Sequence, residues 1–177
     1  MAILQFYSRS APKDDLGLGI PEWRKMLSNF SPVPGGVPVG GRRFPSVEHA
    51  FQAAKFEHTD RPDLMEKFTC AGSMTAEEAK KAGGRKGMTK DGAALRTDEW
   101  ARECDQVMKD ALEARFDVDP EFRRILEAVA DSGATLLHFE RGGGYWGGKV
   151  KDGQIVGENM LGKMMMALPP SKRAKLE

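Results

Sequence analysis

The sequence predicts an α+β fold, mainly helical, organised as a single domain with a few short strands. First, apolar residues recur at intervals of three and four over residues 97–116 and 119–133, which is the pattern of amphipathic helices. Second, only residues 3–8 and 135–140 have the alternating or continuous apolar pattern of strands. Third, a chain of 177 residues can bury one sizeable core, so a single domain is the simplest organisation.

The first half of the chain predicts one strand followed by short helices. After the strand at residues 3–8, the dense prolines and glycines of residues 31–45 predict an irregular loop or a short hairpin. A helix then begins near Ser46. Residues 61–72 favour a second helix, since a proline occupies its first turn and a glycine follows its end. Residues 75–83 predict a third helix, which opens with a threonine–glutamate capping box and stops at a glycine.

The second half predicts two long helices, a buried strand and a final helix. The helix over residues 97–116 is followed by one over residues 119–133, where an aspartate and a proline mark the start and a glycine the end. Residues 135–140 predict a buried strand, residues 141–157 a glycine-rich loop, and residues 158–168 a methionine-rich helix. The apolar stripe of the longest helix contains Trp100, Cys104, Val107, Met108, Ala111 and Leu112.

Composition and charge exclude some classes of protein. The net charge of +1 gives no general attraction to nucleic acid or membranes, so any anion binding requires a local patch. No segment has the roughly 18 apolar residues of a membrane helix, and the N-terminus lacks the features of a secretory signal. We therefore expect no membrane partner. The three histidines lack the spacing of metal ligands, so we expect neither a metal nor a cofactor.

Cysteines and the C-terminal residues bear on the compartment. Cys70 and Cys104 are isolated in the sequence, which favours a reducing compartment and core positions for both. Residues 169–177 form a basic tail with Lys172, Arg173 and Lys175 behind a proline pair. This tail fits a short nuclear import signal and a solvated basic end equally well. We expect a cytoplasmic protein, a nuclear protein, or one present in both compartments.

The first candidate site is one face of the helix that begins near Ser46. Glu48, Phe51, Gln52 and Lys55 lie at i, i+3, i+4 and i+7 and so share that face. Glu48 and Lys55 are too far apart for the usual helical ion pair. Partial burial would raise the pKa of the carboxyl and lower that of the amine, which suits acid–base or covalent chemistry. The alternative is an ordinary helix surface of mixed charge.

Two further segments and one aromatic residue are candidates for ligand binding. Tyr145 and Trp146 lie among glycines, which suits stacking against a base, although the tryptophan could instead anchor a flexible loop. Residues 80–90 collect basic side chains that could attract phosphate, or that simply form a solvated face; Arg85, between glycines, is the best candidate there. Trp100 belongs to an apolar stripe, so core packing is its first interpretation.

Several of these segments occur together in one known family. They are "QFYSRS", "LSNFSP", "FPSVEHAFQAAKF", an "EW" pair before the longest helix, "YWG" and "GENMLGKMMM". Their order and rough spacing resemble those of the NADAR superfamily, which is named for NAD and ADP-ribose and includes the YbiA-like N-glycosidases. The resemblance runs over residues 5–166, and it implies a single catalytic domain over residues 1–168 that cleaves an N-glycosidic bond.

The resemblance also implies roles for individual residues. Glu48 and Lys55 match the reactive pair, with Lys55 attacking the anomeric carbon to form a Schiff base and Glu48 as the acid and base. Lys149 stands where some relatives have an aspartate, and Asp152 is a candidate replacement. The expected substrate-binding residues are Tyr7, Ser8, Arg9, Ser28, Asn29, Phe30, Ser46, Gln52, Arg85, Trp100, Tyr145, Trp146, Gly147, Asp152, Asn159 and Gly162.

The function implied by the resemblance is removal of ADP-ribose from ADP-ribosylated guanine in nucleic acid or nucleotides. Two alternatives stay open: an N-glycosidase acting on phosphoribosyl pyrimidine intermediates of riboflavin synthesis, and a non-catalytic ADP-ribose or NAD-binding module. Retention of both Glu48 and Lys55 speaks against the last, because binding alone requires neither. The partners expected are the ADP-ribose moiety and the nucleic acid or nucleotide that carries it, and a monomer is expected.

Overall fold

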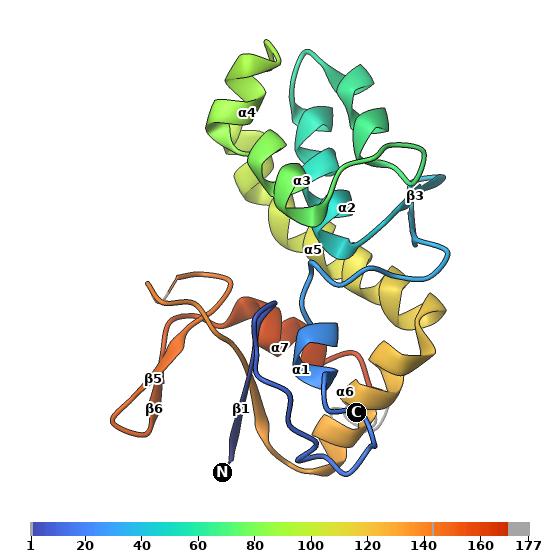
Figure 1. The fold of residues 1–177 in the computed structure, drawn as a ribbon. Coiled ribbons are helices and arrows are strands. Elements are labelled where there is room, and N and C mark those ends of the chain that lie inside the picture. The colour runs from blue at the N-terminus through green and yellow to red at the C-terminus, as the bar shows by residue number, and fades with distance from the viewer. Residues whose placement is uncertain (1, 143, 170–177) are drawn as a thin grey trace, which may run out of the picture. The chain divides into compact units, whose positions relative to one another are not determined.

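The computed structural model describes residues 2–142 and 144–169, and Figure 1 shows their arrangement along the chain. The predicted basic tail lies outside the described residues, apart from Pro169. The fold is α+β and mainly helical with short strands, as predicted. The chain folds into two compact units. One runs from Asn29 to Asp119, and the other contains the residues before and after it.

The unit from Asn29 to Asp119 holds most of the helices. A hairpin of β2 (Val37–Val39) and β3 (Arg42–Phe44) precedes α2 (Val47–Ala54). Two 3₁₀ helices follow, η1 (Lys55–His58) and η2 (Pro62–Phe68). Then come α3 (Ala76–Ala82), α4 (Arg85–Lys90) and the long α5 (Thr97–Val118). Helix α2 packs against both α3 and α5, so it lies at the centre of this unit (Figure 1).

Local sequence explains why α2 forms and why it is buried. The Ser46 side chain caps the helix by accepting a hydrogen bond from the backbone N–H of His49. Alanines and aromatics follow on two faces of the helix, so it can pack closely on its neighbours. The core of this unit consists of Val37, Phe44, Val47, Ala50, Phe51, Ala53, Phe56, Phe68, Met108, Ala111 and Leu112.

The other unit contains the only parallel strand pair within the described residues. Strand β1 (Ile3–Phe6) pairs with β4 (Thr135–His138) in the register that sets Ile3 opposite Thr135. Helices α1 (Trp23–Met26), α6 (Pro120–Asp131) and α7 (Met160–Met166) belong to the same unit, as does the hairpin of β5 (Lys149–Lys151) and β6 (Gln154–Val156). Its core contains Phe6, Trp23, Leu27, Phe122, Ile125, Leu126, Leu136, Leu137 and Leu161.

The structure confirms the predicted elements and adds three that the sequence did not predict. Helices α1 and α4 are single turns or little more, too short to produce a visible periodicity. The β5–β6 hairpin lies inside the predicted glycine-rich loop. The helix predicted over residues 61–72 is instead a 3₁₀ helix that ends at Phe68, because Thr69 becomes extended and its hydroxyl donates to the carbonyl of Glu66.

The expectation that both cysteines lie in the core is wrong. Cys70 is exposed and Cys104 is half-buried, and both are free thiols. Cys70 follows η2, where its backbone N–H donates to the carbonyl of Arg43, so the chain is fixed by main-chain bonding rather than by burial of the thiol. In the part of the chain that the structure describes, no helix combines the length and the apolar character needed to cross a membrane.

Candidate active site

Helix α2 places a carboxyl and an amide on its buried face. Glu48 is 7% exposed and Gln52 is 5% exposed, and both lie one turn apart on the helix. The α-helix ends at Ala54, so Lys55 begins the tighter 3₁₀ turn η1. This change of helix type brings the Lys55 side chain back toward Gln52 rather than leaving it two full turns from Glu48.

A single amide connects the predicted reactive pair. The Gln52 Nε2 group donates a hydrogen bond to Oε1 of Glu48 at 2.8 Å. Lys55 Nζ donates to Oε1 of Gln52 at 2.7 Å and to the backbone carbonyl of Gly83 at 3.1 Å. We call Glu48, Gln52 and Lys55 the relay. Because each polar group has a partner, the three side chains are held in one geometry in spite of their burial.

Aromatic rings form the wall beside the amine. Lys55 Nζ lies 5.5 Å from the centre of the Phe51 ring and 5.8 Å from that of Trp100. These two rings meet edge to face at 5.2 Å, and His58 meets Trp100 at 5.6 Å. Trp100 thus combines its place in the α5 stripe with contact to the site. Such a wall excludes water from the amine and still offers some attraction to its charged form.

Burial moves the two ionisable groups of the relay in opposite directions. The pKa of Glu48 is raised above its ordinary value, chiefly by burial, while the hydrogen bond from Gln52 and the charges of Lys80 and Lys55 oppose this. The pKa of Lys55 is lowered, again chiefly by burial, with Glu48 opposing the change and Lys80 adding to it. Both shifts favour the uncharged forms, a carboxylic acid and a free amine.

A pocket of about 800 Å³ opens beside Lys55. Its lining includes Gly83 and Arg85, with Met88 and Leu95 supplying apolar surface. Arg85 is exposed, so its guanidinium is available to an anionic group at the mouth of the pocket. The arrangement offers a shielded nucleophile, a proton donor and room for a ligand.

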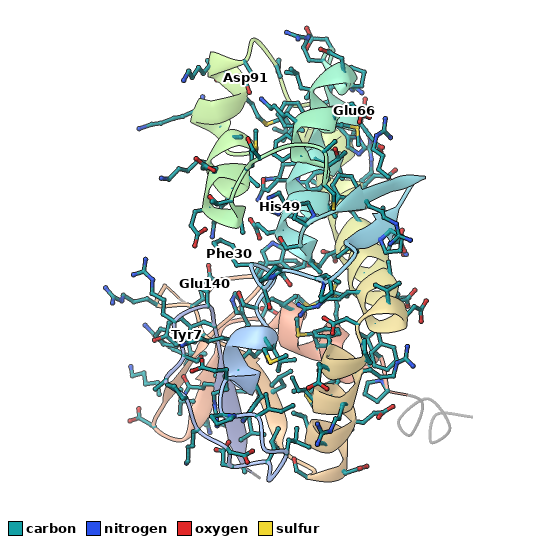
Figure 2. All side chains as sticks on the ribbon, turned by 45° about the vertical axis from the view of Figure 1, so that its right-hand side comes forward. Tyr7, Phe30, His49, Glu66, Asp91 and Glu140 are labelled. Atoms are coloured by element: carbon teal, nitrogen blue, oxygen red, sulfur yellow. The ribbon has the colours of Figure 1, made fainter. Side chains whose placement is uncertain are left out.

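The residues before and at the start of α2 hold its N-terminus in place. Beyond capping the helix, Ser46 Oγ lies 2.8 Å from Nδ1 of His49, which is labelled in Figure 2. Nε2 of His49 faces the carbonyl of Met74 at 2.9 Å, so that nitrogen carries the proton and Nδ1 accepts from the serine. Ser46, a predicted substrate-binding residue, therefore has a structural role in this conformation.

Asn29 and Phe30, both predicted to bind substrate, contact the start of α2 and the end of α3. The backbone carbonyl of Asn29 accepts the N–H of Glu48. Asn29 Nδ2 donates to the sulfur of Met108 at 3.5 Å, whereas its buried Oδ1 has no hydrogen-bond partner among the described residues. That oxygen is an acceptor available to a ligand hydroxyl. The Phe30 ring lies 5.5 Å below Nζ of Lys80.

The remaining predicted site residues belong to the other unit. Tyr7 is half-buried with its ring 5.3 Å from that of Phe139, and Ser8 and Arg9 are exposed in the turn after β1. Ser28 is buried, and its N–H donates to the carbonyl of Lys25. Their roles in substrate binding stay predictions.

The glycine-rich segment presents an aromatic pair. Tyr145 is 45% exposed and meets Trp146 edge to face at 5.1 Å. Gly147 leaves no room for a side chain, since a Cβ there would lie 2.6 Å from the carbonyl oxygen of His138. Asp152 is exposed in the β5–β6 turn with a left-handed φ of 50°. Stacking by Tyr145 and Trp146 is compatible with this exposure.

Asn159 and Gly162 join β4 to α7. Asn159 is buried with a left-handed φ of 52°, its Nδ2 donates to the carbonyl of Leu136 at 2.8 Å, and its Oδ1 accepts from the N–H of His138 at 3.0 Å. A Cβ on Gly162 would lie 2.5 Å from the carbonyl oxygen of Leu136. In this unit the "NMLG" segment therefore secures the helix to the strand, a packing role that its sequence did not reveal.

Sequence reasoning missed two residues of the site. Gly83 supplies the carbonyl that accepts from Lys55, but in the sequence it indicated only the end of a helix. Lys80 acts electrostatically on both Glu48 and Lys55, although its place in a basic segment favoured a solvated face. Its position one turn before the double glycine was the signal that could have pointed to the site.

Comparison with known proteins places this geometry in context. A family model described as the NADAR domain matches residues 20–171. The chain is similar to the N-glycosidase YbiA of Escherichia coli strain K12, with 32% identity over 166 residues, which are 94% of this chain and 86% of that protein. The NMR structure of the E. coli protein YbiA has 28% sequence identity and a TM-score of 0.68, covering 99% of this chain and 88% of the other.

A plant protein shares the same region. The chain is 34% identical over 150 residues to the chloroplastic riboflavin biosynthesis protein PYRR of Zea mays. The match covers 80% of this chain and 22% of the maize protein, so it corresponds to one part of a much longer polypeptide.

Proposed function

Because this chain belongs to the NADAR domain family, we propose that it is an N-glycosidase in which Lys55 and Glu48 perform the reaction. The observation that carries the proposal is the relay, in which a buried carboxyl and a shielded amine are connected through one amide. A binding module would gain nothing from burying these two groups, since desolvation of each costs free energy. A nucleophile and an acid benefit from it, because both reactions start from the uncharged forms.

The first step breaks the bond between the sugar and the base. The lone pair of Lys55 Nζ attacks the anomeric carbon, and the bonding pair of the C–N bond leaves with the base. The leaving nitrogen takes a proton from the Glu48 carboxylic acid, which becomes a carboxylate. The products of this step are the free base and a sugar joined to a protonated Lys55 amine.

The second step releases the sugar. The Glu48 carboxylate removes a proton from the sugar-bound nitrogen and passes it to the ring oxygen, so the ring opens and a Schiff base forms between Lys55 and the anomeric carbon. Water then adds to this carbon, giving its proton to Glu48, and the carbinolamine collapses to an aldehyde and the free amine. Glu48 and Lys55 return to their starting forms.

We propose ADP-ribose attached to guanine, in nucleic acid or in nucleotides, as the substrate. The pocket beside Lys55 has the volume to admit a sugar together with part of its substituent. Arg85 on its lining supplies a cation suited to the diphosphate of ADP-ribose, and the apolar surface of Met88 and Leu95 suits a planar base.

A phosphoribosyl pyrimidine is the second candidate substrate. The similarity to the maize riboflavin biosynthesis protein favours it. Its bond between ribose and nitrogen is chemically equivalent, so the relay would act on it by the same steps. The two candidates differ in size and in charge, because one carries a diphosphate with an adenosine and the other a single phosphate.

A trapping experiment tests the chemistry and the substrate together. An oligonucleotide ADP-ribosylated on guanine and the pyrimidine intermediate are each incubated with the protein, with and without borohydride. We expect release of the sugar from one of them and a borohydride-fixed adduct on the peptide that contains Lys55. Lys55→Ala should abolish both, whereas Lys81→Ala, an exposed lysine of α3, should retain both.

Two results would contradict the proposal. Full activity of Lys55→Ala with no adduct in the parent protein would exclude the covalent route. Binding of ADP-ribose without release from either substrate would instead identify a non-catalytic module.

A further inference from the structure

Lys80 occupies a position between the two ends of the relay. The capping box of Thr75 and Glu78 fixes the start of α3, and Gly83 ends the helix three residues after Lys80. The carbonyl of that glycine accepts the hydrogen bond from Lys55. The helix that carries Lys80 therefore also holds the amine of Lys55 in place.

The other side of Lys80 faces the start of α2. Its Nζ lies 5.5 Å from the centre of the Phe30 ring, a distance typical of a cation–π contact. Phe30 follows Asn29, whose carbonyl accepts the N–H of Glu48. Phe30 thus acts as a platform that keeps an otherwise exposed ammonium group next to the carboxyl, although Lys80 makes no ion pair with Glu48 within the described residues.

We propose that Lys80 is a positioning residue whose fixed positive charge keeps the Lys55 amine unprotonated and stabilises the carboxylate formed when Glu48 gives up its proton. This inference rests on the proposed function. It adds a third charged group to the reaction, one that contacts neither the sugar nor the base.

The charge of Lys80 acts on both members of the pair in the direction that the chemistry requires. It lowers the pKa of Lys55, so more of the amine is free, and it opposes the rise in the pKa of Glu48, so the carboxyl is a better acid. A neighbouring cation is one of the known ways to activate a lysine nucleophile. Burial alone could not do both, because it lowers the pKa of the amine but makes the carboxyl a weaker acid.

Other charged groups near Lys55 do not replace this effect. Glu48 on α2 and the thiol of Cys104 on α5 both favour the protonated amine. Arg85 on α4 lies on the pocket lining, and His58, on the same 3₁₀ helix as Lys55, is bridged toward Glu99 at 3.7 Å. Among the groups that act on Lys55, Lys80 is the cation that favours the free amine.

The test measures the ionisation of Lys55 separately from turnover. The parent protein, Lys80→Met, Lys80→Arg and Lys81→Met are labelled with trace acetic anhydride from about pH 6 to about pH 10, and the Lys55 peptide is quantified by mass spectrometry. Methionine retains most of the stem that packs on Phe30 but removes the charge. Lys81 is the matched control, since it is the next residue of the same helix and its charge acts on Glu78.

In Lys80→Met we expect the labelling curve of Lys55 to move to higher pH. Labelling and glycosidase turnover at about pH 7 should each fall about two- to fivefold, the size expected for a partly screened charge. Turnover should recover as the pH is raised, because the amine then loses its proton without help. Lys80→Arg and Lys81→Met should follow the parent protein in both measurements.

The outcomes separate this inference from the proposed function. An unchanged labelling curve in Lys80→Met overturns the inference, whatever the activity, and so does an equal loss of turnover at every pH. A shifted curve in a protein that releases sugar from neither substrate leaves the effect of Lys80 on Lys55 standing and rejects the proposed function.

Discussion

Substitution of Gly83 by alanine would disrupt the relay through steric contact alone. A Cβ at this position would lie 2.2 Å from Oε1, 2.8 Å from Cβ and 3.0 Å from Cδ of Gln52. Rotation of the Gln52 side chain could relieve the contact with Oε1 but not the one with Cβ, which is fixed by the helix. Since φ of Gly83 is −80°, alanine introduces no backbone strain of its own.

The size of the effect follows from a comparison with the next residue. Gly84 also has an ordinary φ, −81°, and a Cβ there would meet only the carbonyls of Lys81 and Lys80, at 3.3 and 3.4 Å. Both alanine variants gain about 0.4–1 kcal/mol from the lower entropy of the unfolded chain. The difference between them therefore isolates the clash with Gln52, which we expect to cost about 1–3 kcal/mol.

Denaturation and turnover measurements check this reasoning. Urea unfolding should give a lower free energy of unfolding for Gly83→Ala than for Gly84→Ala, and the melting temperatures should differ by about 2–12 °C for a chain of this length. Turnover of Gly83→Ala should also fall, because displacement of Gln52 breaks the hydrogen bonds to Glu48 and Lys55. Equal stability of the two variants would refute the close approach of Gly83 to Gln52.

Three further substitutions test the electrostatics and the packing. Glu48→Gln should abolish turnover but raise the free energy of unfolding at about pH 7, with little change near pH 4, because the raised pKa of Glu48 costs stability as pH rises above 4.5. Asp15→Asn should cost about 1–3 kcal/mol at neutral pH, since Asp15 accepts two hydrogen bonds from Arg24, at 2.8 and 2.6 Å. That loss should shrink in strong acid, because the pKa of Asp15 is held far below its usual range, chiefly by the Arg24 hydrogen bonds, and the pair is lost only as pH falls through it. Asn159→Ala should cost about 2–4 kcal/mol, and Asn159→Gly about 1 kcal/mol less, since glycine adopts the left-handed conformation more readily.

Each of these expectations has a matched measurement. For Asp15 the control is Glu22→Gln, which breaks an exposed ion pair with Lys25 and should change stability by less than about 1 kcal/mol. Equal unfolding free energies of the parent protein and Glu48→Gln at both pH values would mean that the carboxyl is not desolvated. If Asn159→Ala and Asn159→Gly were equally stable, backbone conformation would not contribute at this residue.

Much of the fold could be predicted because short-range signals agreed with the tertiary packing. The capping box at Thr75 and the glycine at position 83 set both ends of α3, and the spacing of apolar residues gave α5 within two residues of its observed end. The β5–β6 hairpin escaped prediction, because its three-residue strands are paired mainly through the backbone and are largely exposed. Exposed strands of this length have no apolar pattern to detect.

The sequence by itself determined which residues share the face of α2, because helical geometry places Glu48, Gln52 and Lys55 in register whatever surrounds them. It also set the helix ends and the family motifs. Only the tertiary structure decided that this face is buried, that Gly83 accepts from Lys55 and that Lys80 lies over Phe30, since these contacts join residues 28 and 50 positions apart. Desolvation and charge depend on distance in space, so the pKa shifts of the relay were fixed by packing and not by spacing along the chain.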